Sequence, residues 1–60
     1  MTLKEARTKA RLSQIELGKL INIDAMTISN WENGRTTPRP ENWRKLESTL
    51  KVKIEFKRGE

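Results

Sequence analysis

The chain has 60 residues, of which 33% are hydrophobic. It contains no cysteine and carries a net charge of +5. A chain of this length forms one small domain, residues 1–60, and buries only about 60% of its unfolded surface. The absence of cysteine excludes a disulfide framework and a cysteine-based zinc site. The excess of basic residues favours a polyanionic partner such as nucleic acid, although a charge of +5 also serves solubility.

No apolar run approaches the roughly 20 residues of a membrane-spanning helix. No signal peptide precedes the first charged residues. We therefore expect a soluble, cytoplasmic protein that has no membrane partner.

Thr2 and Glu5 stand three residues apart, which is the spacing of a helix-starting capping box. In a capping box each side chain accepts a hydrogen bond from the backbone N–H of the other residue. Apolar residues then recur with helical spacing from Leu3 to Ala10. We predict a helix over residues 3–11.

Ser13 and Glu16 form a second capping box. Leu12 and Leu17 flank it at the two positions that pack together as a hydrophobic staple. We predict a second helix over residues 14–20.

Asp24 is a good N-cap for a third helix, which we predict over residues 25–33, and Gly34 suits its end. Only residues 21–23 separate the second and third helices, and their central Asn22 tolerates a left-handed conformation. Two capped helices joined by so short a turn pack at a steep angle. This is the spacing of a helix-turn-helix unit, here residues 14–33, whose second helix enters the DNA major groove. The alternative is any compact helical corner.

Residues 35–40 contain two prolines and two arginines, which predicts a loop, followed by a helix over residues 41–50. Residues 51–57 then alternate polar and apolar, which predicts a strand with one buried face. A fifth helical turn is the alternative. A single strand in a helical chain needs a partner, so we expect the tail, residues 51–60, to pair with a second copy. The predicted dimer interface is Val52, Ile54 and Phe56.

Four short stretches stand out, namely Ser13 and Gln14, Glu16 and Leu17, Thr27 to Ser29, and Trp31 to Arg35. Together they resemble the Cro/CI-type (XRE-family) helix-turn-helix repressors, over about residues 3–52. The resemblance implies a mainly α, compact four-helix, lambda-repressor-like domain. Gly18 stands where the family usually has Ala, and Asn22 where it usually has Gly. Many relatives continue into a fifth helix, whereas some, including HipB-like antitoxins, end in a strand that pairs across the dimer.

The resemblance also implies roles for individual residues. Base reading falls on Ala25, Met26, Thr27 and Asn30. Asn30 can bond adenine bidentately, Thr27 can bond a base or a phosphate, and Ala25 and Met26 can contact thymine methyl groups. Contacts with the DNA backbone fall on Ser13 and Gln14, with Ser29 a weaker candidate, and an ion pair is implied between Arg7 and Glu32. The alternative for Met26 is a partly buried packing residue.

The predicted third helix contains no lysine or arginine, so its own charge cannot supply the affinity for DNA. Residues at its end and in the following loop are better placed to contact phosphates: Asn33, Arg35, Thr36, Thr37 and Arg39. The alternative for the two arginines is solvated loop charge.

The leading hypothesis is a homodimeric, sequence-specific repressor of the phage, prophage or bacterial type, which binds a near-palindromic operator in double-stranded DNA. It would work in the cytoplasm of a bacterial or phage-infected cell. The second hypothesis is an antitoxin that binds a toxin protein and regulates its own gene. An enzyme is disfavoured because the chain has no His, Cys or Tyr and no phosphate-binding glycine loop. We expect no cofactor and no metal.

Overall fold

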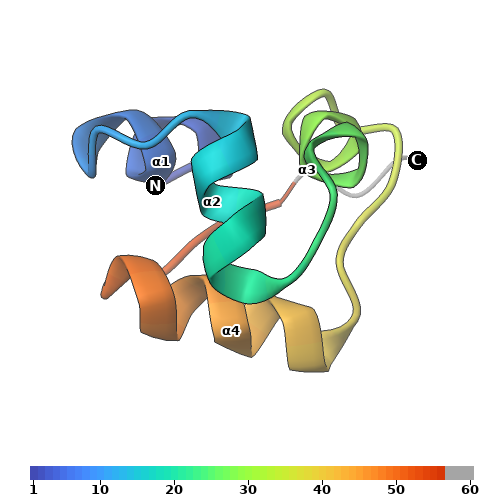
Figure 1. The fold of residues 1–60 in the computed structure, drawn as a ribbon. Coiled ribbons are helices and arrows are strands. Elements are labelled where there is room, and N and C mark those ends of the chain that lie inside the picture. Colours follow the sequence, from blue (N-terminus) through green and yellow to red (C-terminus); the bar gives the residue numbers. More distant parts are fainter. Residues whose placement is uncertain (57–60) are drawn as a thin grey trace.

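The computed structural model describes residues 1–56. It contains four helices, namely α1 (Leu3–Lys9), α2 (Gln14–Ile21), α3 (Ala25–Glu32) and α4 (Pro40–Leu50). In Figure 1, α2 stands between α1 and α3, and α4 lies below it. The predicted mainly α, four-helix architecture is confirmed.

The three predicted N-caps are present. Thr2 and Glu5 form a complete capping box at the start of α1, and Ser13 and Glu16 form another at the start of α2. The side chain of Asp24 accepts a hydrogen bond from a backbone N–H in the first turn of α3. These bonds satisfy N–H groups that have no partner inside a helix, so residues three apart in sequence determine where α1, α2 and α3 begin.

The predicted helix ends are correct to within two residues. α1 stops at Lys9 because Arg11 adopts a left-handed conformation with φ of 60°. The backbone N–H of Leu12 then donates to the carbonyl oxygen of Arg7, 3.1 Å away, which turns the chain toward α2. Asn22 ends α2 in a left-handed conformation with φ of 61°, as predicted for the short turn between the second and third helices.

The hydrophobic core draws on all four helices and on the C-terminal segment. α2 packs against both α3 and α4, and α1 packs against α3. Helices of 7 to 11 residues are marginal in isolation, so their stability depends on this shared core. The buried hydrophobic side chains are Leu3, Ala6, Leu17, Ile21, Ile28, Trp31, Leu46 and Ile54.

The turn between α2 and α3 passes very close to the backbone of α2. The N–H of Ile23 donates to the carbonyl oxygen of Gly18, 2.9 Å away. A Cβ atom at position 18 would overlap the carbonyl oxygen of Ile23. Gly18 therefore permits a close approach between the turn and the helix, and this approach helps to set where α3 begins.

The C-terminal segment differs from the prediction. Over residues 51–56 the alternating sequence forms neither the predicted strand nor the alternative fifth helical turn, only one parallel bridge between Thr2 and Glu55. The N–H of Glu55 donates to the carbonyl oxygen of Met1, 2.9 Å away. The segment therefore finds a backbone partner within its own chain. The last residues of the predicted tail, 57–60, lie outside the described residues.

Ile54 occupies the core of its own chain, where it is only 3% exposed. Its carbonyl oxygen accepts a bond from the indole Nε1 of Trp43, at 3.0 Å, and its N–H donates to the carboxylate of Glu47, at 2.9 Å. Phe56 packs edge-on against Trp43, with ring centroids 4.6 Å apart. Side chains of α4 thus satisfy backbone groups that a neighbouring strand would otherwise have paired, which is why a period of two did not produce a strand.

Gly18→Ala is predicted to destabilise the fold by about 1–3 kcal/mol, because the new methyl group collides with backbone rather than with a movable side chain. This loss would occur although Ala gains about 1 kcal/mol over Gly in a helix interior. Urea unfolding measures it. Lys19→Ala, at the exposed neighbouring position, serves as control and should change stability by less than about 0.5 kcal/mol. A Gly18→Ala protein as stable as the original would contradict the close approach.

Candidate nucleic-acid interface

One face of α3 is directed away from the core. Ile28 and Trp31 are buried, whereas Met26 is 71% exposed. The exposure of Met26 removes the alternative that it is a packing residue. Asn33, directly after the helix, is also exposed, and its amide donates to the Ser29 hydroxyl at 3.4 Å. The remaining residues of this face are partly exposed: Ala25, Thr27, Ser29 and Asn30.

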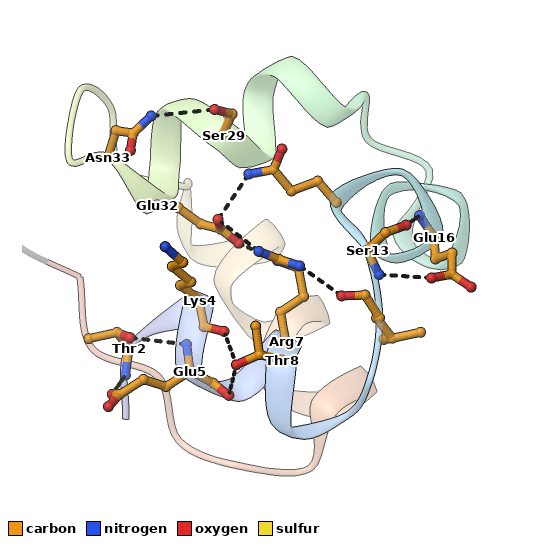
Figure 2. A network of polar contacts seen from close by, with 12 residues as sticks. Thr2, Lys4, Glu5, Arg7, Thr8, Ser13, Glu16, Ser29, Glu32 and Asn33 are labelled. Atoms are coloured by element: carbon orange, nitrogen blue, oxygen red, sulfur yellow. Dashed lines mark hydrogen bonds and ion pairs between the residues drawn. The ribbon is translucent and has the colours of Figure 1, made fainter.

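A buried carboxylate anchors the end of α3. Glu32 forms an ion pair with Arg7 of α1, in which Nε of Arg7 lies 2.6 Å from Oε2 of Glu32. The Glu32 side chain is only 5% exposed and the Arg7 side chain only 12% exposed. A second Arg7 nitrogen donates to the carbonyl oxygen of Leu12, 2.8 Å away, in the turn before α2. Figure 2 shows Arg7 and Glu32 pointing toward one another from the two helices.

Gln14, the first residue of α2, joins the same cluster. Its side-chain Nε2 donates to Oε1 of Glu32 at 2.9 Å. The structure therefore brings together a residue predicted to contact phosphate and a residue predicted to be structural. The sequence held no local signal for this contact, because 18 positions separate the two residues. One amide hydrogen and the amide oxygen of Gln14 remain available to a ligand.

A model of the helix-turn-helix family matches residues 3–57 of the chain. The chain belongs to the helix-turn-helix family. It is 32% identical over 59 residues to Multiprotein-bridging factor 1c of Arabidopsis thaliana, a match that covers 98% of this chain. It is 30% identical over 54 residues to Repressor protein C2 of Salmonella phage P22, covering 90% of this chain. The chain spans 40% and 25% of the length of these two relatives. No solved structure matches it.

The predicted Cro/CI-type class is therefore confirmed, and the family is one of DNA-binding regulatory domains rather than enzymes. Among residues 1–56, no group of acidic, His or Cys side chains is arranged to hold a metal ion. None of the helices described is long and apolar enough to cross a membrane.

The start of α2 offers fewer donors than its helix-turn-helix role suggests. The N–H of Ser13 is already bonded to the Glu16 carboxylate at 2.8 Å, and the Ser13 hydroxyl oxygen accepts from the Glu16 N–H. The backbone bond, followed by the hydroxyl, lowers the pKa of Glu16 below its ordinary value of 4.5. Glu16 is therefore charged at neutral pH. The backbone N–H groups of Gln14 and Ile15, which make no hydrogen bond within residues 1–56, and the second amide hydrogen of Gln14 remain for a phosphate.

The positive charge lies in the loop after α3. Arg35 and Arg39 are exposed, and neither side chain makes a hydrogen bond or ion pair with any part of residues 1–56. Thr36 and Thr37 between them are also exposed, whereas Pro38 is buried and anchors the loop to the domain. The helix-turn-helix domain thus presents a neutral α3 face beside an anchored basic loop.

Arg7→Met is predicted to lower the free energy of unfolding by about 3–5 kcal/mol, because it leaves the buried Glu32 carboxylate without its counter-charge. Replacing both partners, as Arg7→Met with Glu32→Leu, should cost less than Arg7→Met alone, since no buried charge remains. Urea unfolding of the two single variants and the double variant measures the coupling. A double variant whose destabilisation equals the sum of the two single values would show that the ion pair does not couple the two helices.

Proposed function

We propose that this chain is the DNA-binding domain of a transcription regulator, a Cro/CI-type repressor that binds a near-palindromic operator as a homodimer. The observation that carries the proposal is the outward face of α3. A short turn and a buried ion pair fix its position in a chain of the helix-turn-helix family. In such a dimer the two α3 helices enter major grooves about one helical turn of DNA apart.

In this proposal, different residues contact the bases and the phosphates of the DNA. Base reading falls on α3, through Ala25, Met26, Thr27 and Asn30. Contacts with phosphates fall on the α2 start, on the last turn and C-cap of α3, and on the loop: Ser13, Gln14, Ser29, Asn33, Arg35, Thr36, Thr37 and Arg39. The support for this division is that α3 carries no basic residue, whereas the arginines of the loop are exposed and unpaired within residues 1–56.

The dimer contact in this proposal involves Val52 and Phe56, which are only partly buried in the single chain. Ile54 was expected at the same interface, but its place in the core means that it supports the contact from beneath. The site of action that follows is the cytoplasm of a bacterial or phage-infected cell, at the regulated DNA.

A second candidate function is a regulator that also binds a partner protein, such as the antitoxin of a toxin–antitoxin pair. The observation in its favour is the exposure of Ile15 and Leu20 on α2, at 62% and 61%, outside the α3 face. Stoichiometric co-purification of a partner protein from source cells would favour this function. If no partner protein co-purifies, only the DNA-binding proposal remains.

Selection of bound sites from random duplex DNA tests the leading proposal. The expected result is an enriched near-palindrome whose half-sites lie about 10–10.5 base pairs apart, one helical turn. Footprinting on that sequence should protect both half-sites together. If no sequence is enriched and no footprint appears at physiological salt, the chain is not a sequence-specific DNA-binding regulator.

Arg39→Ala is predicted to weaken binding to all DNA sequences alike, because Arg39 neutralises a phosphate in this proposal rather than reading a base. The slope in question is that of the logarithm of the binding constant against the logarithm of the salt concentration. Loss of one phosphate contact should reduce this slope by about 0.9, and loss of one contact in each subunit of a dimer should reduce it by about 1.8. Affinity measured across a salt series gives the slope. Lys45→Ala, which removes an exposed cation of α4 outside the residues proposed to contact DNA or the second subunit, should leave the slope unchanged. A sequence-selective weakening in Arg39→Ala would place that residue at a base instead.

A further inference from the structure

Met26 is the most exposed large hydrophobic side chain of residues 1–56, at 71%. It lies in the first turn of α3. An apolar side chain left in water gives up the favourable free energy of burial. On the outward face of α3 it faces the proposed ligand, the DNA major groove, which offers one apolar group, the C5-methyl of thymine.

Asn30 is the polar neighbour of Met26 on the same face. The two residues are four positions apart in a helix, so their Cβ atoms lie about 5–6 Å from each other. The side-chain amide of Asn30 makes no hydrogen bond with any part of residues 1–56, whereas the nearby Asn33 amide is bonded to Ser29. An Asn amide with both its donor and its acceptor free matches the N6 and N7 edge of adenine bidentately.

The outward face of α3 is poorly suited to guanine. The commonest specific contact with guanine is a bidentate bond from Arg or Lys to O6 and N7. Helix α3 has neither residue in its sequence from Ala25 to Glu32. Its one acidic residue, Glu32, could accept a bond from cytosine, but its carboxylate is buried and paired with Arg7.

We infer that α3 reads A·T pairs, with Met26 packing on a thymine methyl and Asn30 bonding an adenine. Successive base pairs are about 3.4 Å apart along each strand. The separation of the two side chains therefore places the two A·T pairs one or two steps apart in each half-site. This inference rests on the proposed function and adds the base class that the domain recognises.

Replacing single thymines by deoxyuridine tests the role of Met26, because uracil lacks only the methyl group. The operator is first obtained by selection from random duplex DNA. Deoxyuridine at one thymine of each half-site should weaken binding by about fourfold per half-site, the equivalent of one buried methylene group. In Met26→Ala the same replacement should have almost no effect, since the side chain that contacts the methyl is gone. Leu20→Ala, similarly exposed but on α2, should keep the full response to deoxyuridine.

Replacing adenine by 7-deazaadenine tests Asn30 in the same way, because the analogue lacks only the N7 acceptor. One adenine, one or two steps from the sensitive thymine, should show weaker binding with the original chain. The replacement should have no effect with Asn30→Ala.

The outcomes separate this inference from the proposed function. A palindromic operator that is bound equally well with deoxyuridine at every thymine overturns the inference and leaves the proposed function in place. A response to deoxyuridine that persists in Met26→Ala, or selected half-sites whose invariant positions are all G·C, overturns it as well. Failure to select any operator overturns both.

Discussion

The buried ion pair between Glu32 and Arg7 is the interaction on which the rest of the structure depends. It joins the end of α3 to α1, and the same two side chains also hold Gln14 and the carbonyl oxygen of Leu12. Four segments of a small domain thus meet at one pair of opposite charges. The pair also removes an electrostatic conflict, because an unpaired carboxylate at the end of α3 would repel the phosphates of the proposed partner. Its net contribution to stability can be small, but removal of either partner alone leaves a buried charge.

The approach of the α2–α3 turn to Gly18 is the second constraint on α3. Asn22 ends α2 in the left-handed conformation, and the carbonyl oxygen of Ile23 then occupies the space where a side chain at position 18 would lie. α3 is therefore fixed at its beginning by backbone packing and at its end by the ion pair. A rigidly held helix can present Met26 and Asn30 in one geometry, which the recognition of bases requires.

In the proposed complex, selectivity and affinity come from different parts of the domain. The α3 face is nearly neutral and holds the residues proposed to distinguish bases, whereas Arg35 and Arg39 lie in a neighbouring loop that the buried Pro38 anchors. In the proposed complex the loop supplies the salt-dependent part of the binding free energy, which is insensitive to sequence. The helix supplies the smaller differences between one site and another.

The sequence by itself determined where the helices begin, because a cap such as Ser13 with Glu16 depends on residues only three apart. It also determined the left-handed turn at Asn22 and, through the family resemblance, the residues of the α3 face. Only the tertiary structure decided that Ile54 fills the core and that Gln14 bonds Glu32. An alternating segment can bury its apolar face against any complementary surface, and here α4 and the N-terminus supplied that surface within the same chain. Contacts between residues far apart in sequence depend on how the helices pack, and no local pattern encodes them.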